Sequence, residues 1–365
     1  MTPATLSACA AWMQEGKPLL EQRLHLDIAG FHLTIRSNSD LLLTTLRNYF
    51  PPLLHTTAED GVEVDLIERE TLPSPYPLQP WQREAGKRLK DRYFDLPGGR
   101  LIEKSPSSIL FLQSHPLRIA AGETERYPNK VINFINIQQM NHLLQQGALL
   151  FHAAAVAYNH HAYAIAGFSG GGKSTLMLHL LDHPELHFLS NDALYLLQRE
   201  GDTPLEAVGA AKLPRINPGT ILHNGKLHPL LTAERLQQLQ QLPPLDLWRL
   251  EEKYDLPLEE IYGRQRVSFQ AEMKGLVILN WQHNSTQPTT IHPVNLQQRR
   301  DLLPAVMKSP GPFYQNSEGQ FTTTPQGEED AAYLHQLQQI EVLEVRGKVD
   351  FVAARDLLLQ KITGE

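Results

Sequence analysis

Cysteine is nearly absent from this sequence: Cys9 is the only one in 365 residues. A lone cysteine cannot form an internal disulfide, so the small secreted folds that depend on disulfides are excluded. Basic residues are also in short supply, since 33 Lys and Arg stand against 40 Asp and Glu and the formal net charge is −7. This balance argues against a protein that coats nucleic acid, and we expect no nucleic-acid partner.

Long hydrophobic runs are missing as well. The longest apolar stretches, GALLFHAAAVAY at 147–158 and TLMLHLL at 175–181, are too short to span a membrane. The first residues, MTPATLSACAAWMQEGKP, do not place an apolar segment behind a basic one, as a secretory signal would. We therefore expect a cytoplasmic protein with no membrane partner.

The length of 365 residues suggests two domains, because a single hydrophobic core stops growing at about 250–300 residues. Residues 23–39 have the alternation of two strands, and residues 40–50 have apolar positions at helical spacing. We predict a small α+β domain over 1–125, whose role is not readable from the sequence. The motifs that point to chemistry all lie in 126–365, which we predict to be the second domain.

The sequence GFSGGGKS at 167–174 satisfies the phosphate-loop pattern G-x-x-x-x-G-K-[ST] in full. The apolar segment AYAIAG precedes it and an apolar run without a helix breaker follows, which predicts a strand, the loop and a helix in that order. Glycines let the backbone turn with its N–H groups inward, and the helix N-terminus adds about half a positive charge. A glycine-rich turn ahead of a helix is the alternative interpretation.

This loop predicts a nucleotide site. We expect Lys173 to reach the β- and γ-phosphates and the Ser174 hydroxyl to bind Mg²⁺. The residues that we expect to bind ATP are Gly167, Ser169, Gly170, Gly171, Gly172, Lys173, Ser174 and Thr175. A motor or switch protein would add a strand ending in Asp-Glu or an NKxD sequence. Instead, LVILNW ends near Asn280 without an acid, and NKVI at 129–132 lacks the Asp.

Two polar residues interrupt apolar segments on either side of the loop. His152 lies in LLFHAAAV before it, and Asp192 lies in FLSNDALYL after it. The ends of consecutive strands in an open α/β sheet gather at one edge, where the ligand binds, so we expect both residues near Lys173. A carboxylate there accepts the proton of an attacking hydroxyl or binds the metal. The alternatives are a histidine of the core and an aspartate that starts a turn.

The sequence LLFHAAAVAYNHHAYAIAGFSGGGKSTLMLHLL, followed by FLSNDALYLL, resembles the catalytic core of HPr kinase/phosphorylase and its relatives over about residues 149–197. The segments AAKLPRINPGTIL, LWRLEEKYD, GLVILNW and LLPAVMKSPGPF look most like the subgroup of HPr-kinase-related kinase B. The resemblance implies an α/β P-loop kinase domain with a mixed sheet, of the HPr kinase and phosphoenolpyruvate carboxykinase type. It also implies a homo-oligomer, because the parent family assembles into hexamers.

The chemistry that the resemblance implies is ATP-dependent phosphorylation of a hydroxyl with Mg²⁺, in the parent family a serine on a small carrier protein. Carried over to this sequence, Lys173 and Ser174 hold the phosphates and the metal. Asp192 accepts the proton and is the other metal ligand, and His152 lies at the reaction centre.

The sequence also departs from the family pattern. The family's acidic pair is Asn191-Asp192 here, and Thr175 stands where a Glu often follows the Lys-Ser. The family's glycine-rich segment around an Arg is replaced by KLPRINPG. These departures disfavour the reverse phosphorolysis and HPr itself as the acceptor. Forward transfer is less affected, because one base and one metal-bound hydroxyl suffice.

KLPRINPG supplies two cations, Lys212 and Arg215, which we predict to clamp the substrate or the transferring phosphate. A proline-bounded surface loop is the alternative. The charge run of Glu251, Glu252, Lys253 and Asp255 is typical of a solvated helix face, with Glu252 or Asp255 as candidates for a second metal. Lys308 is a further candidate for a functional role, but its Pro-Gly context fits a plain turn equally well.

We therefore expect an ATP-dependent kinase whose acceptor is a hydroxyl, on a protein serine or a small-molecule alcohol. Two alternatives stay open at this point. One is a nucleotide-binding regulatory protein without transfer activity, and the other is a simple ATPase.

Overall fold

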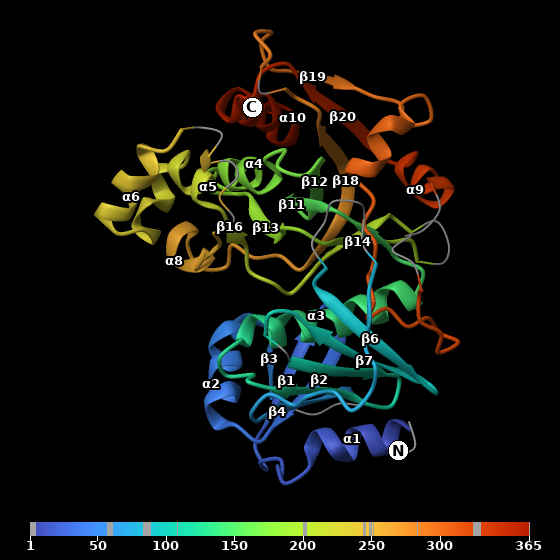
Figure 1. Ribbon diagram of the computed structural model, residues 1–365. Coiled ribbons are helices and arrows are strands. Elements are labelled where there is room, and N and C mark those ends of the chain that lie inside the picture. Colours follow the sequence, from blue (N-terminus) through green and yellow to red (C-terminus); the bar gives the residue numbers. More distant parts are fainter. Residues whose placement is uncertain are drawn as a thin grey trace. The chain divides into compact units, whose positions relative to one another are not determined.

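The computed structural model describes residues 5–56, 61–82, 89–107, 109–199, 203–243, 246–247, 250, 252–282, 284–323 and 330–364. The chain forms two compact units, and the second is interrupted by a segment of the first. Unit 1 contains Met1–Gln146 and Ser309–Gly327, and unit 2 contains Gly147–Lys308 and Glu328–Glu365. Both units combine helices with a mixed sheet, so the chain has the mixed α/β character expected from its sequence (Figure 1).

The sheet of unit 1 has the strand order β3-β1-β2-β4-β9-β8-β7-β6-β5 in the described part of the chain. β4 is parallel to β2 and to β9, and the other pairs are antiparallel. The strands are β1 Arg23–Ile28, β2 Phe31–Ser37, β3 Leu54–His55, β4 Val62–Glu68, β5 Gln79–Pro80, β6 Asp91–Leu96, β7 Gly99–Lys104, β8 Ile109–Ser114 and β9 Arg118–Gly122.

Helices cover both faces of this sheet. They are α1 Leu6–Gln14, α2 Asp40–Tyr49, the 3₁₀ turn η1 Pro51–Leu53 and α3 Pro128–Gln145. Successive side chains of a strand point to opposite faces. Leu110 of β8 packs in a cluster with Met13 of α1, whereas the Phe111 ring lies 5.0 Å from that of Phe134 in α3. α1 and α3 therefore lie on opposite faces of the strands (Figure 1).

The division between the units falls after Gln146, whereas the sequence predicted a boundary after residue 125. The difference is α3, whose apolar side packs on unit 1. The side chain of Gln138 also donates to Gln113 of β8 at 2.9 Å, and both residues are buried. Periodicity predicts that such a helix has an apolar side, but not which sheet that side covers.

Residues 309–323, which we call the strap, complete unit 1 although they interrupt unit 2 in sequence. Arg100 of β7 binds the strap: its Nη1 donates to the carbonyls of Pro312 at 3.1 Å and Thr322 at 2.9 Å. The guanidinium has an exposed fraction of 0% and lies 4.3 Å from the ring centre of Tyr93. Its Nε donates to Asp95 at 2.6 Å. A buried charge is stable only with such a full set of partners.

We expect the Arg100→Met variant to lower the free energy of unfolding by about 3 kcal/mol, because two strap carbonyls lose their donor and Asp95 loses its charge partner. The measurement is a urea unfolding curve of the full chain. Arg92→Met is the matched control, since Arg92 lies on the neighbouring strand, is 52% exposed and pairs with Glu103 at 3.2 Å; we expect a loss below about 1 kcal/mol there. Equal losses in the two variants would contradict the structural role of Arg100.

The main sheet of unit 2 has the order β10-β14-β15-β18-β12-β11-β13 in the described residues, with β20 beside β18 and β19 beside β20. β18 is parallel to β12 and to β20, and the remaining pairs are antiparallel. The strands are β10 Leu149–Phe151, β11 Ala153–Tyr158, β12 His161–Gly167, β13 His187–Ser190, β14 Leu194–Leu197, β15 Glu206–Gly209, β18 Gln270–Leu279, β19 Thr290–Pro293 and β20 Glu341–Arg346. β16 Arg215–Ile216 and β17 Tyr254–Asp255 form a separate pair.

Helices pack on both faces of this sheet too. They are α4 Lys173–Leu180, α5 Pro218–Leu222, η2 Gly225–Leu230, α6 Ala233–Gln240, α8 Leu258–Tyr262, η3 Arg300–Ala305, α9 Asp330–Leu337 and α10 Phe351–Thr363. On one face Val156 of β11 shares a core with Leu176 of α4 and Leu358 of α10. On the other face Ala155 shares a core with Leu334 of α9. Within the described residues, no helix is long and apolar enough to cross a lipid bilayer.

Candidate phosphate-binding site

The glycine-rich loop lies between the end of β12 and the start of α4, as the sequence predicted. Gly170 has φ 77° and Gly172 has φ 88°, left-handed conformations that favour glycine. Gly172 is the N-cap of α4 and provides no side-chain cap. A Cβ at Gly172 would lie 2.6 Å from the ring of Phe351, so the position excludes larger residues for a second reason.

The strands on either side of β12 and a tryptophan fix the position of this loop. β12 lies between β11 and β18, and in the parallel register Gly167 faces Leu279. A Cβ on Gly167 would approach the Leu279 Cβ to 3.1 Å, which explains a glycine at the strand end. Just beyond β18, Trp281 donates from Nε1 to the carbonyl of Gly171 at 2.9 Å. The conformation of the loop is thus fixed by the sheet and by an indole hydrogen bond.

Lys173, the first residue of α4, bends back over the loop. Its Nζ donates to the carbonyl of Gly167 at 2.9 Å. Burial lowers the pKa of Lys173 to about 8, with the charge of Asp192 opposing this effect and that of Lys308 adding to it. Among the residues that the structure describes, the ammonium has no counter-ion in direct contact, and the charge of Asp192 acts on it from a distance. A phosphate would supply the missing charge.

The hydroxyl residues after Lys173 have different surroundings. Ser174 is half-buried, and in the described part of the chain its hydroxyl has no hydrogen-bond partner. The Thr175 hydroxyl is buried and lies 2.8 Å from that of Thr220, so this side chain has a structural contact. Thr175 faces a phosphate site only through its backbone N–H, which belongs to the uncapped first turn of α4. Ser169 and Gly170 are exposed at the tip of the loop.

Asp192 lies in the turn between β13 and β14 and is bound by two side chains. Its Oδ1 is 3.3 Å from Nε2 of His152. Lys308 donates to Oδ2 and, at 2.8 Å, to the Asp192 carbonyl. Although the side chain is 64% exposed, packing around it would raise the pKa of Asp192. The charge of Lys308 and the hydrogen bond with His152 outweigh that effect and hold the pKa well below its usual value.

Strand pairing brings these three segments together. β13 pairs with β11 through Ser190 and Ala155, and β14 pairs with β10 through Leu194 and Phe151. The turn that carries Asp192 therefore joins the strands on either side of His152, which stands between β10 and β11. The backbone N–H of His152 donates to Val306 at 2.7 Å, and Phe151 forms a bridge to Met307. Lys308 follows Met307 directly; its sequence context fitted a functional role and a plain turn equally well.

The two cations of KLPRINPG, Lys212 and Arg215, have different surroundings. Arg215 has its Nε 2.7 Å from Asp255 Oδ1 in the β16–β17 pair, so it is already matched by a carboxylate. Lys212 lies closer to the candidate site, because its loop begins where Ala210 donates to the carbonyl of Ala193 at 3.3 Å. Burial lowers the pKa of Lys212 to about 8, an effect that the charge of Asp192 opposes.

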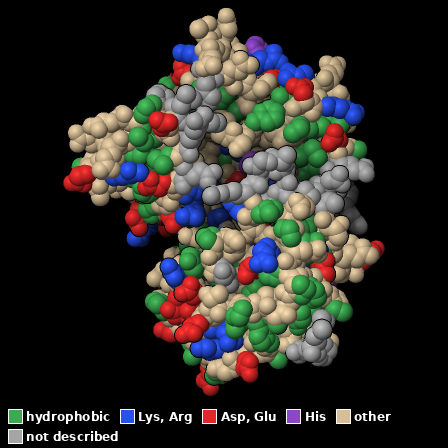
Figure 2. Space-filling model, in the orientation of Figure 1, with side chains coloured by type: hydrophobic (Ala, Val, Ile, Leu, Met, Phe, Trp, Pro, Cys, Tyr) green, Lys and Arg blue, Asp and Glu red, His purple; other side chains and the backbone are tan. Residues whose placement is uncertain are grey.

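The acidic run after α6 offers no second metal site in the described residues. Glu251 lies outside them. Glu252 accepts from Arg235 at 2.5 Å and from the Tyr254 hydroxyl, and Asp255 pairs with Arg215. No group of three His, Cys, Asp or Glu residues that the structure describes is arranged to hold a metal ion. Figure 2 shows acidic and basic side chains interspersed over α6 and its neighbours, at the left of the view.

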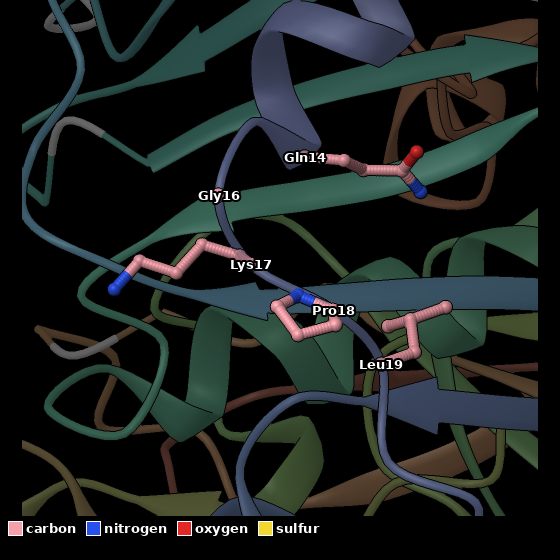
Figure 3. Close-up of a pocket in the computed structure, with 5 residues that line it drawn as sticks. All are labelled: Gln14, Gly16, Lys17, Pro18 and Leu19. Carbon is pink, nitrogen blue, oxygen red and sulfur yellow. The ribbon is translucent and has the colours of Figure 1, made fainter.

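A surface hollow lies in unit 1, near the end of α1 (Figure 3). Its lining residues are Gln14, Gly16, Lys17, Pro18 and Leu19. Lys17 is the one ionisable residue among them, and none belongs to the glycine-rich loop or to the surroundings of Asp192. The hollow therefore adds nothing to the phosphate site.

Comparison with known proteins gives limited similarity. No protein-family model matches the chain, and no curated protein matches it. Among solved structures, the HPr(Ser) kinase/phosphatase from Coxiella burnetii is similar over 59% of this chain and 88% of that chain, at 12% sequence identity and a TM-score of 0.30. That TM-score does not make the two folds equivalent, so the site is interpreted from its own residues.

Proposed function

We propose that this protein is an HPr-kinase-like phosphotransferase that moves the γ-phosphoryl group of ATP to a hydroxyl acceptor. One observation carries the proposal: β11 pairs antiparallel with both β12 and β13, so the end of β12, which leads into the loop of Lys173, and the turn of Asp192 after β13 lie at the same edge of the sheet. The loop is suited to a triphosphate and the carboxylate to a proton. Within this class, the segments shared with HPr-kinase-related kinase B make that subgroup our more specific proposal.

The residues present fit a nucleotide and Mg²⁺. Lys173 and the uncapped N–H groups of α4 offer charge and donors to the phosphates. The Ser174 hydroxyl is an oxygen ligand of the kind that Mg²⁺ takes, and the ion completes its shell with water and phosphate oxygens. Asn191 adds a buried side-chain oxygen without a hydrogen-bond partner among the described residues. Bound Mg²⁺ would neutralise charge on the β- and γ-phosphates.

In the proposed step, Asp192 takes the proton of the acceptor hydroxyl. The acceptor oxygen forms a bond to the γ-phosphorus as the bond from that phosphorus to the bridging oxygen breaks, and ADP leaves with that electron pair. His152 orients the carboxylate through Oδ1, and Lys308 holds Oδ2 and stabilises the charged form. Because both partners already bind its oxygens, we assign Asp192 the role of base ahead of that of metal ligand.

A second candidate function follows from the same contacts. Both oxygens of Asp192 have partners, and Asn191 stands beside it where a second carboxylate would strengthen metal binding. Such a site favours a nucleotide-binding regulatory protein that does not transfer phosphate. A simple ATPase is the third possibility, in which water takes the place of the acceptor hydroxyl.

One experiment separates the three. Purified full-length protein is incubated with Mg²⁺, γ-labelled ATP and a lysate from which ATP has been removed. We expect the label to appear in a protein or a small metabolite, identified by gel and by mass spectrometry. Label recovered only as inorganic phosphate would identify an ATPase. Binding of ATP without turnover would identify the regulatory protein.

A further inference from the structure

Lys212 has no role in the reaction proposed above. It lies in the connection between β15 and β16, where its backbone N–H donates to Ala210 at 2.7 Å. The residue is half-buried, and its ammonium makes no hydrogen bond or ion pair with any residue that the structure describes. Burial of a charge is unfavourable unless a counter-charge joins it. The position therefore calls for an anion.

No carboxylate among the described residues forms an ion pair with Lys212. Of the described charges, those that act on it are one carboxylate, Asp192, and three cations, Arg215, Lys308 and Lys253. Asp192 already pairs with Lys308, and Arg215 already pairs with Asp255. The surroundings of Lys212 thus carry a surplus of positive charge next to the proposed base. In the proposed reaction the triphosphate binds Lys173, a second cation that has no ion pair among the described residues.

We propose that Lys212 binds an anionic group of the acceptor itself, so that the acceptor is a small hydroxylated anion, a carboxylate or a phosphate. This inference rests on the proposed function and makes it more specific. The acceptor would place its hydroxyl at Asp192 and its anionic group at Lys212. A lysine acts as a point charge, which suits either anion, whereas a bidentate arginine would impose one planar geometry. An uncharged alcohol would leave Lys212 without a partner.

The test uses sulfate as the probe, because sulfate keeps its charge between pH 7 and pH 9. Full-length protein is saturated with Mg²⁺ and the non-hydrolysable analogue AMP-PNP and then titrated with sulfate in a calorimeter. We expect one sulfate site in the wild type, weakened about 10- to 100-fold in Lys212→Met, the range of a charge-assisted hydrogen bond. The affinity for Mg·AMP-PNP should be equal in both proteins.

Lys361→Met is the matched control. Lys361 is 43% exposed, and its Nζ lies 2.8 Å from Glu341, on α10 and away from the loop residues. We expect this variant to bind sulfate and Mg·AMP-PNP as the wild type does. Methionine keeps the length and the apolar stem of lysine, and thermal unfolding curves check that both variants fold.

Each other outcome overturns the inference. Nucleotide-loaded wild type that binds no sulfate, or Lys212→Met that binds it equally well, shows that Lys212 does not take an anion. Loss of Mg·AMP-PNP affinity in Lys212→Met assigns this lysine to the nucleotide. A protein serine labelled equally by the wild type and by Lys212→Met excludes a small anionic acceptor. If the wild type does not bind Mg·AMP-PNP at all, the proposed function itself fails, which is a distinct result.

The sulfate site should also depend on pH. The pKa of Lys212 is about 8, and only its protonated form attracts the anion, so binding is strong below that pH and weakens above it. We expect the sulfate Kd to rise about tenfold between pH 7 and pH 9 in the nucleotide-loaded wild type. Asp192, Arg215, Lys308 and Lys253 also face Lys212. The same titration of Lys212→Met therefore measures the pH dependence that these four groups cause. If the sulfate Kd of this variant rose as much between pH 7 and pH 9 as that of the wild type, Lys212 would not be the group that binds sulfate.

Discussion

Asp192→Asn is expected to reduce phosphoryl transfer by about 10²- to 10⁴-fold, the usual contribution of a positioned base. Asparagine keeps the shape of the side chain but cannot take the proton of the acceptor hydroxyl. The affinity for Mg·ATP should change little, because the loop and α4 are untouched. Transfer is measured as initial rates with γ-labelled ATP and the acceptor identified from lysate, and affinity is measured by calorimetry.

Asp356→Asn serves as the control for loss of a carboxylate in the same unit. Asp356 is 58% exposed on α10 and pairs with Arg355 at 2.8 Å. We expect wild-type rates from this variant. An Asp192→Asn protein that is as active as the wild type would refute the assigned base. A variant that loses nucleotide affinity instead would make Asp192 part of the metal site.

Lys173→Met is expected to weaken Mg·ATP binding about 100-fold, because one or more charge-assisted hydrogen bonds to phosphate oxygens are lost. The variant should fold normally, because the substitution removes one hydrogen bond of Nζ within the described residues, the one to the carbonyl of Gly167. Calorimetric titration with Mg·AMP-PNP gives the affinity, and Lys361→Met is again the control. Unchanged affinity in Lys173→Met would show that the nucleotide does not enter the glycine-rich loop.

Local features of the site could be predicted from the sequence because they depend on neighbouring residues. The glycines at 170 and 172 adopt left-handed conformations that other residues avoid, and the apolar segments around them form β12 and α4. The approach of His152 and Asp192, which we expected from the order of strands, is present at 3.3 Å. Their chemical roles stay predictions until the variants are measured.

Long-range pairing could not be predicted in the same way. Lys308 is 116 residues from Asp192 in sequence and reaches it through the bridge between Phe151 and Met307. Nothing in the sequence VMKSPGPF distinguishes that lysine from one in an exposed turn. The same holds for Arg215, whose partner Asp255 lies on a separate short strand. The alternation of apolar residues sets the register once two strands meet, but it does not say which distant segments meet.

The extent of unit 1 depends on long-range packing of the same kind. α3 and the strap each place a phenylalanine, Phe134 and Phe313, against Phe111 of β8. Phe313 of the strap lies 5.7 Å from the ring of Phe111, and Asn141 of α3 donates to the Phe313 carbonyl at 3.1 Å. A pattern of apolar residues shows that a segment packs, but the sheet on which it packs is set by the complete chain.

The strap has a consequence for how this chain can be divided. Unit 1 consists of two stretches of sequence, and the second stretch interrupts the sequence of unit 2. A single cut of the backbone therefore releases neither unit whole. A fragment that ends at Gln146 would expose Phe111 and leave the guanidinium of Arg100 without the carbonyls that it binds. Truncating the chain at one point therefore yields neither unit complete.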